Sequence, residues 1–263
     1  MNSLKIKRTL LDALLGAGKI LKRSIHAPKD IQKKSALSIV TATDKAAEKF
    51  VLKTILKAFP SHAILSEESP PTGNSASRWI IDPLDGTSNF AHSYPVCCVS
   101  IGFEHEGRIR MGGVYDPFRD ELFWAEAGKG ATRNGKKIHV SRTSQMTDAL
   151  LATGFAYDRR ERMDVYLPIF REFLMKTQDL RRAGAAALDL CYVACGRFDG
   201  YWEMNLQPWD KAAAMLIVAE AGGRLSNFSG KPLTLEDVQN VASNGHLHGQ
   251  MLKILKDFSG AGK

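Results

Sequence analysis

The sequence lacks long apolar runs and contains few cysteines, and these two absences exclude several classes of protein. No apolar run approaches the ~18 residues that a bilayer-spanning helix needs. The N-terminus lacks the basic start, apolar centre and cleavage site of a secretory signal. The 4 cysteines of the 263 residues fit neither a metal-binding spacing nor a dense disulfide framework. We therefore expect a cytoplasmic protein with reduced core cysteines and no membrane partner.

The histidines supply no catalytic pattern. The 7 histidines are scattered and match no nucleophile or metal-site spacing. His246 and His248 begin the last predicted helix, directly after an Asn-Gly turn signal. We therefore expect both to lie in a solvated helix start and not to form a metal-binding pair.

The net charge of +8 is concentrated at the N-terminus. Residues 1–34 contain 9 Lys or Arg against 2 Asp, a net +7, so the rest of the chain is close to neutral. A basic segment of this kind can attract nucleic acid, an anionic surface or a phosphorylated substrate. It can equally be the solvated face of a helix, and the sequence leaves both interpretations open.

The apolar periodicity predicts helices interleaved with strands. We expect helices over 3–24, 41–59 (with Thr43 or Asp44 near its N-cap), 160–176, 184–196, 209–223 and 247–257. We expect strands over 62–69, 78–82, 94–106, 108–117, 121–127, 149–155, 178–183, 198–204 and 240–245. This alternation predicts one layered α/β domain over residues 1–263, which can divide into lobes of about 1–145 and 146–263.

Residues 79–90, WIIDPLDGTSNF, place two aspartates three positions apart after an apolar stretch typical of a buried strand. Carboxylates at the end of a core strand are costly unless something binds them. Pro83 keeps Asp82 extended, and Gly86 permits a tight turn into a short helix. Asp82 and Asp85 would then lie beside free N–H groups, which form an anion site. A cation such as Mg²⁺ reconciles carboxylates with an anion site, whereas simple helix capping is the alternative.

Two other stretches place acidic residues at the ends of predicted elements. In SEES, Glu67 and Glu68 follow a strand, and adjacent residues on extended chain face opposite ways, so one of them can point inward. Asp210 begins an apolar helix and, considered alone, would be an N-cap. Three acidic element ends in one chain predict a carboxylate cluster that collects metal ions.

The chain resembles the inositol monophosphatase family of Mg²⁺-dependent, lithium-sensitive phosphatases. The resemblance covers nearly the whole chain and rests on TATD, SEES, WIIDPLDGTSNF, WEMNLQPWDKAAAMLIVAEAGG and ASNG, in the same order and spacing. RRAGAAALDL and GRFDGYWE are most similar to bacterial members. The resemblance implies a layered αβαβα fold and a homodimer.

The resemblance also implies a set of metal ligands. Glu67, Asp82 and the backbone carbonyl of Leu84 would hold one Mg²⁺. Asp82, Asp85 and Asp210 would hold a second. Glu67 would also reach a more weakly held third ion, which gives two to three ions per active site.

The remaining site residues follow from the same resemblance. Asp44 and Glu68 would support the ligands from behind. Substrate contacts would come from Asp85, Gly86, Thr87, Gly184, Ala185, Ala186 and Glu203, with Glu203 hydrogen-bonded to substrate hydroxyls. Many relatives have Ser or Thr where this chain has Ala185, which weakens the expectation of inositol phosphate as the substrate.

The chemistry expected of such a site is hydrolysis of a phosphate monoester. The metal ions neutralise the ester and lower the pKa of a water, which Glu67 and Thr87 position, while Asp82 bridges the ions. Because phosphoryl transfer depends mainly on positioning and electrostatics, it needs no protein nucleophile. Inositol 1-phosphate is the leading substrate. Fructose 1,6-bisphosphate, histidinol phosphate, a nucleotide 3′-phosphate and NADP are alternatives, and an RNA- or protein-binding regulator on a phosphatase scaffold is a different class of function.

Overall fold

The structure, a computed structural model, describes residues 2–27 and 29–260. Within these residues the helices are α1 (Ser3–Ser24), α2 (Ala42–Ala58), α3 (Thr87–Ala91), α4 (Met163–Lys176), α5 (Ala186–Ala194), α6 (Pro208–Glu220) and α7 (His248–Leu255). Two short 3-10 helices cover Met146–Asp148 and Lys256–Phe258. No helix in this part of the chain combines the length and apolar character that crossing a bilayer requires.

The described strands form three sheets. A short hairpin pairs β1 (Ile31–Lys33) with β2 (Ile39–Thr41). The largest sheet has the order β3-β4-β5-β6-β7-β8-β9, with β3 (Ala63–Ser66), β4 (Ser77–Asp85), β5 (Cys98–His105), β6 (Arg108–Asp116), β7 (Glu121–Glu126), β8 (Ala131–Arg133) and β9 (Lys136–Lys137). The third sheet has the order β11-β10-β12-β14-β13, with β10 (Leu150–Thr153), β11 (Asp179–Arg181), β12 (Gly200–Met204), β13 (Arg224–Ser226) and β14 (Gln239–Ser243).

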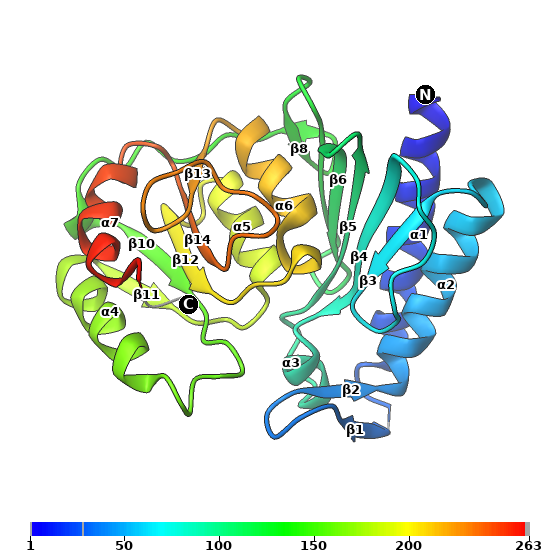
Figure 1. Ribbon diagram of the computed structural model, residues 1–263, viewed down its shortest axis with the longest axis horizontal. Helices are drawn as coiled ribbons and strands as arrows, with labels where there is room; N and C mark the ends of the chain where they lie inside the picture. Colours follow the sequence, from blue (N-terminus) through cyan, green and yellow to red (C-terminus); the bar gives the residue numbers. More distant parts are fainter. Residues whose placement is uncertain (1, 28, 261–263) are drawn as a thin grey trace.

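The elements stack in five layers (Figure 1). Helices α1 and α2 cover the outer face of the largest sheet, α5 and α6 lie between the two main sheets, and α4 and α7 cover the far face of the third sheet. Each helix buries an apolar stripe; in α1 the stripe includes Leu10, Leu14 and Leu21. The predicted αβαβα fold is therefore confirmed.

Three local predictions were wrong. Thr41, not Thr43 or Asp44, is the N-cap of α2, and Gln207 is the N-cap of α6. In both helices the acid is the third helical residue, and its carboxylate accepts a hydrogen bond from the N-cap N–H. His248 is fully buried, with its ring nitrogens 2.9 Å from the hydroxyl oxygens of two serines, whereas His246 is exposed as expected.

The cysteine prediction is confirmed for the described residues. Cys97, Cys98 and Cys191 are buried, Cys195 is partly buried, and all four are free thiols. Strands β1, β2, β8, β9 and β13 were not predicted, because strands of two or three residues carry little pattern that distinguishes them from loops.

Candidate active site

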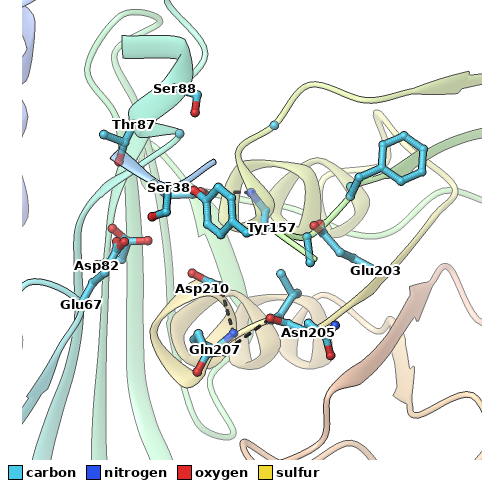
Figure 2. Close-up of a pocket in the computed structure, with 18 of the residues that line it drawn as sticks. Ser38, Glu67, Asp82, Thr87, Ser88, Tyr157, Glu203, Asn205, Gln207 and Asp210 are labelled. Atoms are coloured by element: carbon cyan, nitrogen blue, oxygen red, sulfur yellow. Dashed lines mark hydrogen bonds between the residues drawn. The ribbon is translucent and has the colours of Figure 1, made fainter. Parts of the chain in front are cut away.

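A cavity of about 560 Å³ lies where the end of β4 faces the segment after β12. It collects residues that are far apart in the sequence. From the predicted set, its walls contain Glu67, Asp82, Leu84, Asp85, Gly86, Thr87, Gly184, Ala186, Glu203 and Asp210. Figure 2 shows Glu67 and Asp82 on one side of the cavity and Glu203 on the other.

An irregularity in β4 brings both aspartates of its motif to the cavity. The strand continues through Pro83 to Asp85, beyond the predicted end at Asp82, and its pairing register with β5 shifts between Asp82 and Asp85. In a regular strand, side chains three positions apart face opposite sides of the sheet. The shift removes this constraint, so both carboxylates line the cavity.

Two of the cavity's carboxylates also cap helices. Asp85 accepts hydrogen bonds from the N–H groups of Ala186 and Ala187, at 3.2 and 2.8 Å, and so caps α5 rather than its neighbour α3. Asp210 accepts from the N–H of Gln207 at 2.7 Å. A carboxylate has about four lone-pair sites, so capping leaves both residues able to bind a cation.

The carboxylates repel one another. Burial raises the pKa of Asp82 well above its usual range, and the nearby charges of Glu67, Asp85 and Asp210 raise it further. Burial is also the main reason that the pKa of Asp85 rises to about 7 and that of Asp210 rises. Such a group of acids is stable as anions only when a cation lies among them.

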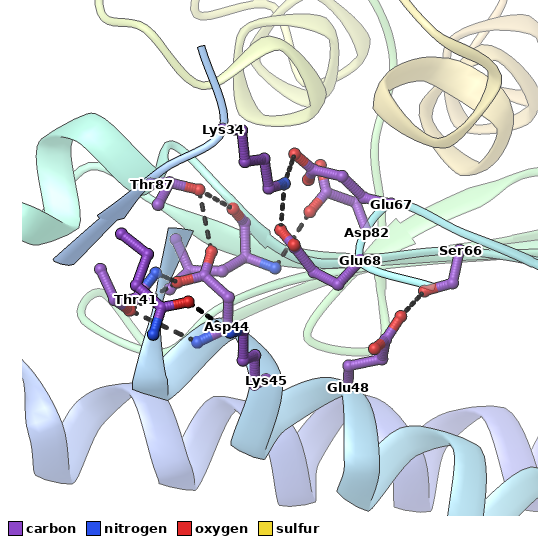
Figure 3. A network of polar contacts seen from close by, with 12 residues as sticks. Lys34, Thr41, Asp44, Lys45, Glu48, Ser66, Glu67, Glu68, Asp82 and Thr87 are labelled. Carbon is purple, nitrogen blue, oxygen red and sulfur yellow. Dashed lines mark hydrogen bonds and ion pairs between the residues drawn. The ribbon is translucent and has the colours of Figure 1, made fainter. Parts of the chain in front are cut away.

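Gly86 and Thr87 form the turn that follows the acidic strand. Gly86 has φ 92°, and a side chain there would lie 2.8 Å from the carbonyl oxygen of Val96, so only glycine fits. The Thr87 hydroxyl oxygen lies 2.9 Å from Asp44 Oδ1 and 3.1 Å from the carbonyl oxygen of Leu84 (Figure 3). Asp44 is held in turn by the α2 capping box, so helix α2 positions the Thr87 hydroxyl.

Of the adjacent residues Glu67 and Glu68, one was predicted to point inward. Glu67 lines the cavity and Glu68 does not. Lys34 bridges them, with its ammonium 3.1 Å from Glu67 Oε1 and 2.6 Å from Glu68 Oε1 (Figure 3). Lys34 also lines the cavity. From the sequence it was expected only to contribute to the basic N-terminal segment.

On the opposite side, Glu203 extends from β12. Its Oε2 accepts a short hydrogen bond from the Tyr201 hydroxyl, which leaves Oε1 available to a ligand. A Cβ at Gly154 would lie 2.1 Å from either carboxylate oxygen, so only glycine can lie beneath Glu203. Burial raises the pKa of Glu203 to about 7.

The cavity differs from the predicted site in its other lining residues. Ala185 is only 1% exposed and does not line the cavity, because its side chain packs into the core beside α5. Tyr157, Arg182 and Asn205 do line it and were not predicted. Of these three residues, only Arg182 lies in one of the motifs noted in the sequence, RRAGAAALDL.

Behind the cavity, α5 buries a carboxyl group that no sequence pattern indicated. Asp189 is 1% exposed, and its Oδ1 has no hydrogen-bond partner among the described residues. Burial, together with Glu203 and Asp85, raises the pKa of Asp189 well above its usual range. The buried position of Asp189 thus favours its protonated form.

The donor set of the cavity fits a hard divalent cation. Its candidate ligands are carboxylate oxygens and the Leu84 carbonyl, the oxygen donors that Mg²⁺ prefers. Within residues 2–27 and 29–260, no three His, Cys, Asp or Glu side chains converge closely enough to hold a metal ion together. Asp85 and Asp210 also accept hydrogen bonds from helix-start N–H groups, so part of each carboxylate is already engaged.

Comparisons with known proteins agree with one another. A profile of the Inositol monophosphatase family matches residues 4–259. The chain is 46% identical to an inositol-1-monophosphatase from Synechocystis sp., over 93% of this chain and 86% of that protein. It is 43% identical to the Nus factor SuhB of Pseudomonas aeruginosa, over 89% of each chain. The structure of an inositol monophosphatase from Anabaena (Nostoc) sp. superposes with a TM-score of 0.89 at 44% identity, over 98% of this chain and 97% of that one.

Proposed function

The chain belongs to the inositol monophosphatase family and is a phosphatase, and we propose that it hydrolyses inositol 1-phosphate, or a similar polyol phosphate, with Mg²⁺. The observation that carries the proposal is the pairing, across one cavity, of the carboxylates of Glu67, Asp82, Asp85 and Asp210 with Glu203. The first group suits cations. Glu203 suits the hydroxyl groups of a polyol.

The acidic residues would hold the metal in overlapping sets. Glu67, Asp82 and the Leu84 carbonyl would hold one Mg²⁺, and Asp82, Asp85 and Asp210 a second. A third ion at Glu67 would compete with the Lys34 ammonium, which lies 3.1 Å from that carboxylate. When bound, the metal would neutralise the phosphate ester, lower the pKa of a water and stabilise the leaving alkoxide.

The chain's own residues would orient the attacking water. The Thr87 hydroxyl lies within hydrogen-bond distance of Asp44 and the Leu84 carbonyl, both acceptors, so it would donate its proton to one of them. The lone pairs of the hydroxyl oxygen can then accept a hydrogen bond from a water, which Glu67 would position from the other side. The phosphate would rest on Gly86 and Thr87, where the turn after β4 begins α3.

Glu203 would select the alcohol part of the substrate. Its free Oε1 can accept a hydrogen bond from a substrate hydroxyl, and the Tyr201 hydroxyl fixes its orientation. Gly184 and Ala186 would line the same side of the pocket. Ala185 would influence substrate choice only through the position of α5, since its methyl group is buried.

A panel assay tests the proposal. Phosphate release would be measured from inositol 1-phosphate, fructose 1,6-bisphosphate, histidinol phosphate, a nucleotide 3′-phosphate and NADP, each with Mg²⁺ and with EDTA. We expect metal-dependent turnover that is fastest with inositol 1-phosphate. Turnover of a nucleotide alone would refute the polyol assignment, and EDTA-resistant turnover would refute the metal assignment.

Lithium supplies an independent check of the metal assignment. Li⁺ is small and hard, and it could replace one Mg²⁺ without supplying the same charge. We expect Li⁺ to inhibit at millimolar concentration and rising Mg²⁺ to alter the inhibition. Full activity in high-millimolar lithium would show that the metal site differs from the one described above.

A regulatory role is a second candidate, because several relatives are named Nus factor SuhB. Such a role would require contacts with nucleic acid or protein outside the cavity. A homodimer, which the family resemblance implies, would be compatible with either role. Size-exclusion chromatography with light scattering measures the oligomeric state directly.

A further inference from the structure

The outer faces of α1 and α2 form one strongly basic surface. Ten charged side chains are exposed on it: nine are lysine or arginine, and Asp12 is the single acid. The basic residues are Lys5, Arg8, Lys19, Lys22, Arg23, Lys45, Lys49, Lys53 and Lys57. We call these nine residues the basic face.

Nine of the ten exposed charged side chains on these two helices are therefore cations. The formal charge of the two helices is lower than the charge exposed on their outer faces, because α2 contains two acids that face inward. Asp44 is hydrogen-bonded to Thr41, and Glu48 accepts hydrogen bonds from two serine hydroxyls at 2.6 Å. The four lysines of α2 are thus uncompensated at the surface, and the charge extends beyond the basic segment of residues 1–34.

The lysines of α2 follow one another at intervals of four residues. Lys45, Lys49, Lys53 and Lys57 therefore form a single ladder along the helix, about 18 Å long at 1.5 Å per residue. Like charges four residues apart repel and destabilise a helix. Within the described residues, Lys49, Lys53 and Lys57 form no ion pair that would offset this repulsion.

The two helices lie side by side and antiparallel (Figure 1). The Lys5 ammonium lies 2.7 Å from the carbonyl oxygen of Ala58, at the far end of α2. Midway along, the Phe50 ring packs directly against Gly16, where any side chain would clash with it. This close contact holds the basic residues of α1 and the lysine ladder of α2 on two directly packed helices.

The surface suits the phosphate backbone of a nucleic acid better than a membrane. A helix that binds a membrane surface inserts its apolar face, but the apolar faces of α1 and α2 are buried against the largest sheet. Base stacking would require exposed aromatic rings. Phe50 is the aromatic residue of this surface, and it is only 37% exposed and packed on Gly16.

We propose that the basic face binds the backbone of a double-stranded nucleic acid without reading its bases. Cations on two directly packed helices match the regular phosphates of a duplex, and they provide no groove-reading element. None of the nine residues lines the cavity, so this binding is separate from phosphate-ester hydrolysis. The proposal does not depend on the identity of the phosphatase substrate.

The test uses the 263-residue chain, blunt RNA and DNA duplexes of one sequence with hydroxyl ends, and their separated single strands. Binding is followed by fluorescence anisotropy over a series of salt concentrations. Binding to anionic phospholipid vesicles is measured in parallel by co-sedimentation. The variant is Lys49→Gln/Lys53→Gln, since glutamine has nearly the same helix propensity as lysine. The matched control is Lys253→Gln/Lys256→Gln, which removes the same charge from exposed positions at the other end of the molecule.

We expect wild type and the control to bind both duplexes, with affinity that falls steeply as salt rises. In the ladder variant, affinity should fall by about tenfold, and the slope of log K against log salt should decrease by about two. Its phosphatase activity should be unchanged. An equal loss in the control, or wild-type binding by the ladder variant, would refute the proposal. Tighter binding to the single strand, or binding only to anionic phospholipid vesicles, would refute it as well.

Discussion

The two sides of the cavity are built from different parts of the chain. One side, here called the acidic wall, consists of Glu67, Asp82, Asp85 and Asp210, which lie at or near the ends of regular elements. The other side, the recognition wall, consists of Arg182, Glu203 and Asn205, and two of these three residues lie in loops. The acidic wall places like charges together at a cost in stability, whereas the recognition wall mixes acidic, basic and neutral groups. The comparison suggests that one wall is built for cations and the other for the substrate.

Replacing Asp82, which belongs to both proposed metal-binding sets, should abolish the function of the acidic wall. We expect Asp82→Asn to lower kcat by at least about 1000-fold, because metal-centred stabilisation is worth several kcal/mol. Because the variant loses a repelled carboxylate, its metal-free form should melt at a higher temperature than wild type. Phosphate release and thermal melting measure the two effects. Retention of more than about a tenth of the wild-type rate would contradict the role of Asp82.

The hydroxyl of Thr87 should matter next most. Thr87→Val keeps the shape of the side chain but cannot orient a water, so we expect kcat to fall by about 100-fold or more. Thr87→Ser keeps the hydroxyl within reach of Asp44 and should recover most of the rate. Steady-state kinetics measures kcat for both variants. Equal losses in the two would indicate a packing role for Thr87 instead.

A change in the recognition wall should affect binding and spare the chemistry. We expect Glu203→Gln to raise KM for inositol 1-phosphate by about tenfold, because a charged hydrogen-bond acceptor is lost. The KM for 4-nitrophenyl phosphate, which has no hydroxyl groups, should not change. A parallel rise in KM for both substrates would show that Glu203 acts on the phosphate, and the distinction between the walls would fail.

The smallest expected effect is a pH-dependent shift in melting temperature. The pKa of Asp85 is raised to about 7, above its unfolded value of about 4. Folded protein without metal therefore holds protons that the unfolded chain has released, so its stability should fall as pH rises from about 4 to 7. A bound cation reverses this effect. The melting-temperature gain from Mg²⁺ should thus increase with pH across this range.

His248 has the opposite pH dependence and must be separated from this effect. Burial lowers its pKa to about 4, so its contribution to stability increases as pH rises from about 4 to 6.5. His248 lies between Ser226 and Ser243, outside the cavity lining. Its contribution is therefore the same with Mg²⁺ and with EDTA, and it cancels in the difference between the two melting curves. A Mg²⁺-induced gain that is independent of pH would contradict the raised pKa of Asp85.

The acidic wall could be predicted because its residues follow local rules. Each lies next to a strand end or a helix start, and the order of Asp82, Pro83, Asp85 and Gly86 restricts the backbone strongly. What the sequence did not reveal is the register shift in β4, which depends on pairing with β5. The cap of α5 by Asp85 was also hidden, because it joins residues about 100 positions apart.

The recognition wall could be predicted only in part, for the same physical reason. Glu203 lies on a strand within a long motif, so it was found. Tyr157 and Asn205 reach the cavity through irregular backbone, and Asn205 has φ 62°, which no pattern in its neighbours predicts. The family resemblance placed Ala185 in the pocket, but its side chain packs into the core at the start of α5.

The most direct test of the account is calorimetric titration of Mg²⁺ into wild type, Asp82→Asn and Glu203→Gln without substrate. The readout is binding, so it does not depend on the choice of substrate. We expect wild type and Glu203→Gln to bind Mg²⁺ with the same affinity and stoichiometry, and Asp82→Asn to lose the binding. Unchanged binding by Asp82→Asn, or lost binding by Glu203→Gln, would contradict the assignment of the metal to the acidic wall.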